Sequence, residues 1–277
     1  MIGDVVASVL AQDGIERVEE VLVVGRDEPG RLRHGGRVRF IDTVRPVSEP
    51  VARNLGLAAT RADLVLFLDS DCLPQPGSLR EHLAAHAAGH RLVSGSVLAE
   101  DEGYWPLVYN LSLFYAFLES VPGGPRPSLP TLNLSLARGV AETVGPFDES
   151  LTRATDLDWT LRARRAGVGL RFWPAAAVLH RHPRRTLAAV WRDCAGSGFH
   201  SRRVRLRHTE LLGTPWWLRS RLAVRALSPW LALGVTAAVV ARWPATFRGR
   251  WHALPAFLLT KLAWGWGASA PDASHHR

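Results

Sequence analysis

The stretch LVLFLDSDCLP at residues 64–74 constrains the fold of this chain more than any other part of the sequence. Five consecutive apolar residues are typical of a buried strand, inside a sheet that is covered on both faces. The run ends in Asp69 and Asp71, although two carboxylates this close repel each other. Open parallel sheets bind ligands beyond the carboxyl ends of their strands, so this strand end is a candidate binding site.

The first hundred residues alternate between short apolar runs and segments with helical spacing. Strands are expected at 19–25, 37–42, 64–69 and 91–100, and helices at 1–12, 48–62 and 76–89. This alternation predicts an α/β fold with a mostly parallel sheet and helices on both faces.

The pattern changes beyond residue 100. We expect an aromatic helix at 100–120, a strand at 131–137, a short helix at 140–145 and a longer helix that begins near Asp156. The apolar runs at 168–174 and 176–182 are expected to flank a turn or short strand.

Several function classes are excluded by single residues. The formal charge is +9, yet Lys261 is the only lysine, so the chain lacks the lysine of a phosphate-binding P-loop. An aspartyl-nucleophile phosphatase is also set aside, because Leu73 stands where threonine or valine is expected. Cys72 and Cys194 match no metal spacing and form no disulfide framework. The amphipathic start, which carries Asp4, is not typical of a signal peptide.

The paired aspartates predict a metal site. Side chains alternate along an extended strand, so Asp69 and Asp71 are expected to point to the same side. A hard divalent cation would relieve their repulsion, and Mg²⁺ takes one or two carboxylates together with substrate phosphates. The motif therefore predicts a metal-bound diphosphate; a solvated turn at the strand end is the alternative.

Six segments together carry a family resemblance. They are ARNLG (52–56), LVLFLDSDCLPQPG (64–77), TLNLSLAR (131–138), VGPFDESL (144–151), TDLDWTLRARRAG (155–167) and the histidines of LHRH (179–182). In this order and spacing the chain resembles the family-2 inverting glycosyltransferases of the GT-A fold over roughly residues 4–205.

The resemblance implies a nucleotide-sugar donor and a divalent metal, Mn²⁺ or Mg²⁺. Asp69 would contact the ribose side of the nucleotide and the metal, and Asp71 would bind the metal, which would act as a Lewis acid on the departing diphosphate. His180 is the third expected metal ligand, with His182 as the alternative. Arg53 and Asn54 would line the nucleotide pocket; a surface position is the other possibility for Arg53.

The resemblance also implies a general base. Asp156 would take the proton of the acceptor hydroxyl, and the N-terminus of a helix suits a carboxylate there. Asp158 is the alternative base, and plain helix capping by Thr155 and Asp156 is the structural alternative. Thr155 stands where the family commonly has an acid.

The acceptor side is less defined. Asn133 and Arg138 are expected near the sugar, unless the loop before them is only structural. The chain lacks the QxxRW motif of processive relatives, so we expect one sugar per encounter. The acceptor would be a lipid, a glycan or a small hydroxyl compound.

The chain departs from the family at its start. Relatives usually open with an additional central strand before the first helix, and here the sequence begins inside that helix. Buried backbone groups without partners cost about 1–3 kcal/mol each, so the difference is large. Three explanations are a start codon placed too late, direct pairing of the flanking strands, or a degenerate enzyme; we expect the first.

The C-terminal part is basic and apolar. Residues 181–208 hold eight arginines and one acid, and seven of the eleven tryptophans follow residue 215. The uncharged run 226–241 would reach about 24 Å as a helix, short of a hydrocarbon core of about 30 Å. We expect helices embedded in or lying along an anionic membrane on its cytoplasmic face. A solvated basic face or a helical lid is the alternative, and nucleic acid is not expected as a partner.

The sequence therefore predicts a glycosyltransferase domain at 1–205, N-terminally truncated, and a membrane-associated helical tail at 206–277. The predicted activity is metal-dependent transfer of a single sugar with inversion, in the synthesis of the cell envelope, a glycolipid or another glycan. A non-catalytic membrane-bound module of the same fold is the alternative, because of Thr155 and the absent first strand.

Overall fold

The computed structural model describes residues 2–27, 35–99 and 103–271, and the chain forms two compact units. The first unit comprises Met1–Leu98 and Gly123–Arg181, and the second comprises Ala99–Pro122 and His182–Arg277. The expected boundary at residue 205 falls inside the continuous helix α7 (Leu187–Arg207). Because that helix packs as one element against α10 (Leu254–Ala268), the units divide at Arg181 instead.

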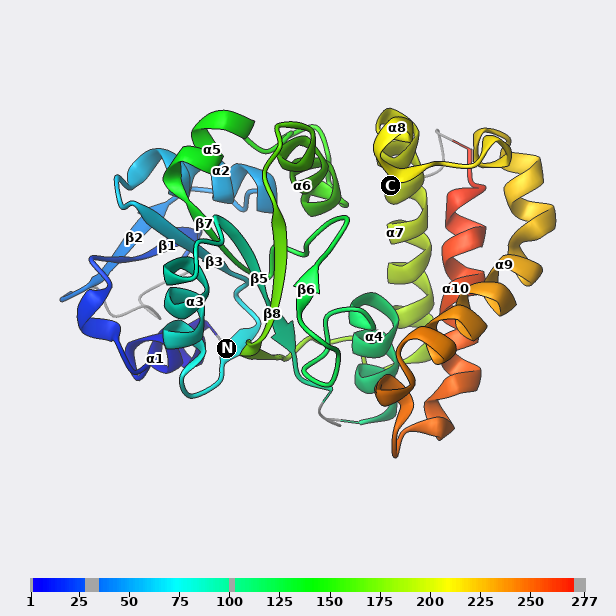
Figure 1. The fold of residues 1–277 in the computed structure, drawn as a ribbon, viewed down its shortest axis with the longest axis horizontal. Helices are drawn as coiled ribbons and strands as arrows, with labels where there is room; N and C mark the ends of the chain where they lie inside the picture. The colour runs from blue at the N-terminus through cyan, green and yellow to red at the C-terminus, as the bar shows by residue number, and fades with distance from the viewer. Residues whose placement is uncertain (1, 28–34, 100–102, 272–277) are drawn as a thin grey trace. The chain divides into compact units, whose positions relative to one another are not determined.

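The first unit contains both β-sheets (Figure 1). Its helices are α1 (Ile2–Leu10), η1 (Ile15–Arg17), α2 (Glu49–Ala59), α3 (Ser78–Ala87), α5 (Arg138–Val144) and α6 (Thr155–Arg165). Its strands are β1 (Val21–Gly25), β2 (Val38–Asp42), β3 (Leu64–Leu68), β4 (Cys72–Pro74), β5 (Leu92–Val97), β6 (Gly124–Pro125), β7 (Asn133–Ala137) and β8 (Leu170–His180). The α/β class predicted from the alternation is confirmed.

The larger sheet is mixed, so the prediction of a mostly parallel sheet was wrong. Its strand order is β3-β7-β5-β8-β4, and β6 pairs with β8. Among its described neighbouring strands, only β5 and β8 pair in parallel; β7 is antiparallel to both β3 and β5, and β4 and β6 are antiparallel to β8. The chain leaves this unit after β5 and returns at Gly123, and β7 then enters the sheet between β3 and β5.

Strand β8 is longer than the expected turn or short strand. It runs over eleven residues despite Pro174, because a register shift opposite Gly95 accommodates the irregularity. A Cβ atom at Gly95 would overlap the carbonyl oxygen of Ala176 and the side-chain amide of Asn133. Glycine is therefore required here by the close approach of the two strands.

Both faces of the larger sheet are covered at its strand β7. Ser135 in β7 makes hydrogen bonds to His82 and His86 of α3 on one face. Leu134 and Leu136, which point to the opposite face, are fully buried. Strand β7 is thus central and buried on both sides, as expected for a core strand.

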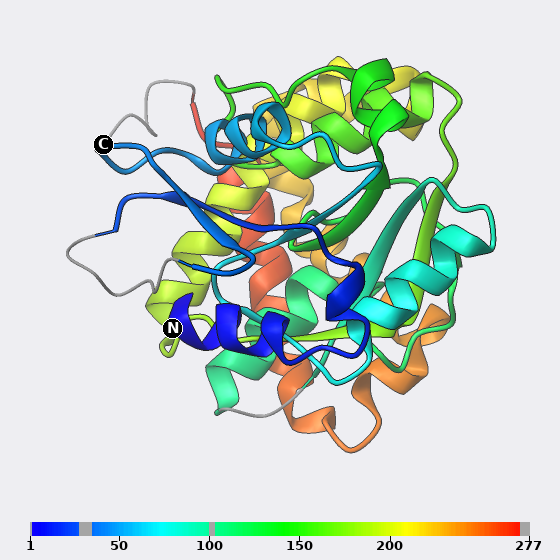
Figure 2. The same cartoon turned by 90° about the vertical axis from the view of Figure 1, so that its left-hand side faces the viewer.

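Strands β1 and β2 form a separate two-stranded parallel sheet, which Figure 2 shows toward the viewer. Among the residues that the structure describes, β1 pairs with β2 alone and β3 pairs with β7 alone. Leu64 and Leu66 of β3 are exposed accordingly, at 39% and 37%. Direct pairing of the strands that flank the expected first strand, one of the three explanations above, is therefore wrong.

The second unit is helical. Its elements are α4 (Tyr104–Phe114), α7, α8 (Thr209–Leu212), η2 (Trp216–Arg219), α9 (Arg221–Arg242), η3 (Pro244–Phe247), η4 (Trp251–Ala253) and α10. Helix α10 packs closely on its neighbours: a Cβ at Gly267 would overlap the backbone of Ala195 in α7, and one at Gly265 would overlap Ser228 in α9. The only lysine, Lys261, lies between α10 and α4 and donates to the carbonyl of Ser112 at 2.7 Å.

Helix α9 is long and apolar enough to cross a membrane by length and composition, with a mean hydropathy of 1.6 over its most apolar window. Only 28% of that window is buried within the protein. It is the one helix of this kind among the described residues, and most of its apolar surface is exposed.

Candidate active site

The two aspartates of the DSD motif lie in a tight turn. Strand β3 ends at Leu68, and the amide of Cys72 donates to the carbonyl of Asp69 at 3.0 Å. The backbone is therefore not extended between Asp69 and Asp71, and the expectation that both side chains point to one side because of strand alternation does not apply. The two carboxylates contact different partners.

Asp69 pairs with Arg53. The Nη2 atom of Arg53 donates to Oδ1 of Asp69 at 2.8 Å. The Nη1 atom lies 3.4 Å from the carboxylate of Glu49, one turn earlier in α2, and 3.5 Å from the hydroxyl of Thr155 at the start of α6. Arg53 is 8% exposed and so is not a surface arginine. It connects α2, the end of β3 and the start of α6.

Asp71 lies beside His180. One carboxylate oxygen of Asp71, the Sγ of Cys72 and one ring nitrogen of His180 all lie within 4.8 Å of one another. The Nε2 atom of His180 is 3.5 Å from Oδ2 of Asp71. The ladder of β4 and β8 fixes this arrangement, because Cys72 is registered opposite His180. The amide of Arg181 also donates to the carbonyl of Asp71 at 2.8 Å.

The three side chains differ as metal ligands. A carboxylate oxygen and an imidazole nitrogen suit Mn²⁺, and the carboxylate also suits Mg²⁺. Cys72 is fully buried, and burial together with Asp69 and Asp71 raises the pKa of its thiol well above the ordinary value. A protonated thiol is a weak ligand, so Asp71 and His180 are the residues here that fit a hard cation.

Asp156 lies in the first turn of α6. Ala154, the residue just before α6, has a φ of 58°, a left-handed conformation that a residue with a side chain rarely adopts. Burial raises the pKa of Asp156, while the amide of Leu157 and the Arg53 guanidinium oppose that shift. A carboxylate with a raised pKa is a stronger base than an ordinary aspartate, which suits proton abstraction.

The loop before α6 is held rigidly. Asn54 accepts a hydrogen bond from the amide of Phe147 at 2.8 Å and donates to its carbonyl at 3.0 Å. The Phe147 ring stacks on Trp159 of α6 with centroids 4.9 Å apart. Asn54, predicted to line the nucleotide pocket, therefore fixes the loop that leads to Asp156.

Asp158 has a different environment from Asp156. It is 5% exposed, and its Oδ2 accepts from Nε of Arg162 at 3.0 Å. The same guanidinium donates to the carbonyls of Val144 and Pro146. Asp158 is thus held in an ion pair with Arg162, which also binds the loop before α6. In this arrangement the Asp158 carboxylate is not available as a base.

Asn133 lies in the core rather than at a surface. It is 1% exposed, its Oδ1 lies 2.8 Å from Nε2 of His82, and its Nδ2 donates to the carbonyl of Ala176 at 2.8 Å. Arg138, also expected near the sugar, donates to the carbonyls of Thr60 and Ala62. The side chains of both residues are engaged in holding strands and loops together.

His182, the alternative metal ligand, belongs to the second unit. Its ring packs on Tyr109 with centroids 4.4 Å apart, and its Nδ1 accepts from the amide of Arg184 at 3.2 Å. The structure therefore groups His180, and not His182, with Asp71.

Sequence reasoning missed three contributors to this site: Glu49, Cys72 and the strained Ala154. Glu49 precedes Arg53 by one helical turn, so an i,i+4 acid–base pair was visible in the sequence. Cys72 directly follows Asp71, but its partner His180 is brought in by a register that no local pattern indicates. No local signal indicated the left-handed backbone at Ala154.

Comparison with known proteins agrees with this architecture. Residues 1–123 match the model of glycosyl transferase family 2. The chain is 36% identical over 152 residues to the pre-mycofactocin glycosyltransferase of Mycobacterium tuberculosis, covering 50% of this chain and 31% of that protein. It is 29% identical over 189 residues to the glycosyltransferase AglE of Haloferax volcanii, covering 66% of this chain and 57% of AglE. The chain thus spans about a third of the length of the first relative and just over half of the second.

A solved structure extends the likeness over nearly the whole chain. Residues 1–349 of S. aureus TarS superpose with a TM-score of 0.52 and 14% identity, covering 96% of this chain and 86% of that structure. Such a likeness shows the fold. Residues 1–123 of the chain are similar to glycosyl transferase family 2, and the first unit has the GT-A fold.

Proposed function

We propose that this protein transfers a single sugar from a nucleotide-sugar to an acceptor hydroxyl with inversion at the anomeric carbon. The observation that carries the proposal is the cluster of Arg53, Asp69 and Asp156, in the same unit as the Asp71–His180 pair. A base with a raised pKa and a cation-binding pair in one GT-A unit supply the two functions that the reaction needs.

Asp71 and His180 would hold Mn²⁺ or Mg²⁺, and the ion, when bound, would neutralise the charge that develops on the departing nucleoside diphosphate. Asp69 is fixed on the nucleotide side by Arg53. Thr155, where relatives commonly have an acid, contributes a hydroxyl near Arg53, and the proposal takes Asp156 as the base.

Asp156 acts on the acceptor. It takes the proton of the acceptor hydroxyl as that oxygen bonds to the anomeric carbon, and the bond from that carbon to the phosphate oxygen breaks. Attack opposite the leaving group inverts the configuration. The N-terminus of α6 stabilises the carboxylate until the proton arrives.

The acceptor is a lipid, a glycan or a small hydroxyl compound, in the synthesis of the cell envelope or another glycan. The exposed apolar helix α9 supports an acceptor at a membrane surface, and the cytoplasmic face of that membrane is part of the proposal. Attachment of the second unit to that membrane is part of the proposal.

A nucleotide-release assay tests the proposal. The full chain is incubated with a panel of nucleotide-sugars, Mn²⁺ and acceptors of the three classes. Asp156→Asn should abolish transfer and leave metal-dependent donor binding intact by titration calorimetry. The control Asp63→Asn, at an exposed position, should leave both transfer and donor binding intact. Absence of metal-dependent donor binding in the unmodified protein would instead support the non-catalytic module.

A further inference from the structure

Helix α9 has one buried face and one exposed apolar face. The buried residues recur at helical spacing and face α10: Val224, Ser228, Ala232, Thr236 and Val239. The exposed face carries Leu222, Trp230 and Leu233, which are 83%, 71% and 49% exposed. Trp216, in η2 just before α9, is 79% exposed. Large contiguous apolar surfaces of this kind mark a partner or a membrane.

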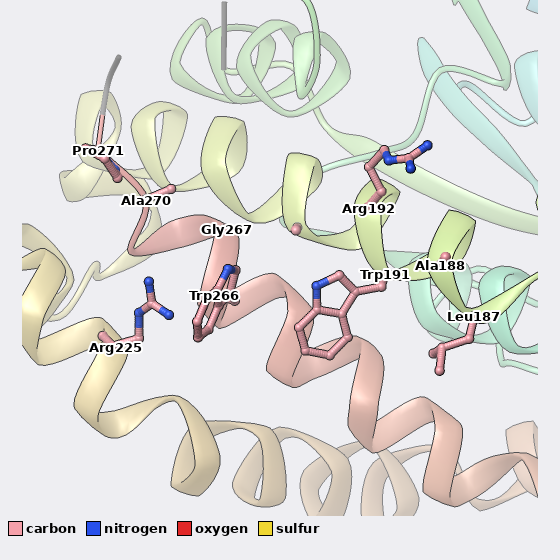
Figure 3. A pocket seen from close by; sticks show the side chains of 10 residues that line it. Leu187, Ala188, Trp191, Arg192, Arg225, Trp266, Gly267, Ala270 and Pro271 are labelled. Atoms are coloured by element: carbon pink, nitrogen blue, oxygen red, sulfur yellow. The ribbon is translucent and has the colours of Figure 1, made fainter. Parts of the chain in front are cut away.

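A cavity of about 850 Å³ opens in the same unit, between α7, α9 and the end of α10 (Figure 3). Its walls are mainly apolar, with Leu187, Trp191 and Trp266 as the large side chains. Small residues of α7 and α10 make up most of the remaining wall. No acid is present among the described residues that line it.

Arg225 supplies the charge at this cavity. Its guanidinium lies 3.4 Å from the centre of the Trp266 ring and points toward that ring in Figure 3. Arg192 also lines the cavity, but its side chain projects away from Trp191. A guanidinium stacked on an indole is held in place, which lowers the entropy lost on binding an anion.

The surroundings favour an anion with an apolar body. Arg225 stands on α9 one turn after Leu222, so the cavity and the exposed apolar face belong to the same helix. Tryptophan and arginine together are typical of the boundary between headgroups and acyl chains. A free phosphate would use the single stacked guanidinium but none of the apolar wall.

We propose that this cavity seats the phosphate headgroup of an anionic phospholipid, with Arg225 on the phosphate and the Trp191–Trp266 wall against the acyl chains. The inference rests on the membrane attachment proposed above and adds a specific lipid site to it. The exposed face of α9 binds the bilayer, and the cavity favours its anionic lipids because its described lining has no acid to pair with a cationic headgroup.

The test is co-sedimentation of the full chain with vesicles of phosphatidylcholine alone or with phosphatidylglycerol. Binding to neutral vesicles measures the proposed attachment through α9. The gain in the vesicle association constant when phosphatidylglycerol is included measures lipid binding in the cavity. Arg225→Gln should reduce that gain about tenfold or more. Arg221→Gln, the matched loss of charge from the same helix outside the cavity, should reduce it by about fivefold or less, the effect of one surface charge.

Two further measurements complete the test. Trp266→Phe should retain most of the gain in binding to phosphatidylglycerol vesicles, and Trp266→Ala should lose it. Circular dichroism and sugar transfer to a soluble acceptor show whether each variant is folded. On the unmodified protein, short-chain phosphatidylglycerol should displace phosphatidylglycerol vesicles, while inorganic phosphate at the same concentration should not. Equal losses in Arg225→Gln and Arg221→Gln, or equal displacement by inorganic phosphate, would overturn the lipid site without touching the proposed transferase activity.

Discussion

Arg53 donates to Asp69 across 2.8 Å, and this ion pair joins helix α2 to the strand end at which the nucleotide is proposed to bind. The guanidinium also reaches Glu49 and Thr155, so a single buried cation organises three oxygen-bearing side chains. Its planar fork is suited to this, because several donors are presented in fixed directions.

Arg53→Lys should therefore weaken donor use although it preserves the charge. A lysine ammonium cannot reach Asp69, Glu49 and Thr155 at once, and a hydrogen bond to a charged group contributes about 1.5–3 kcal/mol. We expect kcat/KM to fall roughly ten- to hundredfold. Steady-state kinetics measure the effect, with the exposed Arg61→Lys as the matched control. An unchanged kcat/KM would remove Arg53 from the site.

The pH dependence of transfer should report Asp156. Burial raises its pKa, and the base must be deprotonated to act, so activity should be lost on acidification at a higher pH than for an ordinary aspartate. Arg53 lowers this pKa by its charge. In Arg53→Gln, the acidic limb of the kcat/KM profile should therefore move to still higher pH. A limb that stays in place would mean that another group titrates.

The metal should depend on Asp71 and His180 but not on Cys72. Removal of divalent ions by a chelator should abolish transfer, and Mn²⁺ should restore it. His180→Gln should weaken Mn²⁺ binding by about tenfold or more, the usual effect of altering a metal site. Cys72→Ser should leave Mn²⁺ binding nearly unchanged, because the buried thiol is protonated. Electron paramagnetic resonance of Mn²⁺ titrations distinguishes the two variants, and equal losses would contradict this assignment.

Stability should fall on mild acidification because of His82. Burial lowers the pKa of His82 from 6.5 to about 4, so the unfolded chain binds a proton at a pH where the folded chain does not. The free energy of unfolding should thus decrease as pH falls from about 6.5 to 4, by about 3 kcal/mol in total, and this contribution should level off below that range. Urea unfolding at a series of pH values measures the slope. His82→Gln should remove this component, and an unaltered slope would contradict it.

The sequence predicted most elements of the first unit because their signals are local. The run LVLFL indicates a strand by composition, and Pro76 with Gly89 encloses α3. The expected burial of that strand was wrong, because β3 lies at the end of the strand order with Leu64 and Leu66 exposed. The partners of each strand are not local: the sequence of β7 does not state that it lies antiparallel between β3 and β5. The predicted strand directions in the sheet were therefore wrong, although the predicted α/β class was right.

The site was predictable in part for the same reason. Asp69, Asp71 and Asp156 follow from short motifs, but strand alternation failed at Asp71 because the amide of Cys72 closes a turn on Asp69. Asn133 fits the motif and yet lies in the core, since His82 comes from a helix about fifty positions earlier. Which polar residue faces the ligand and which faces the core depends on packing between distant segments.

The irregular strand β8 offers the last prediction. Gly95→Ala would place a methyl group where the carbonyl of Ala176 and the amide of Asn133 now lie, and both belong to strands that cannot shift independently. We expect a loss of about 3 kcal/mol or more in the free energy of unfolding, in the range of severe overpacking. Gly169→Ala is the matched control, because no atom lies within 4 Å of its added Cβ. Because Ala176 lies in β8, the strand that ends at His180, and Asn133 donates to its carbonyl, the Gly95 variant should also lose Mn²⁺ binding before it unfolds. Loss of less than about 1 kcal/mol in urea unfolding would show that the two strands are not held as closely as the structure has them.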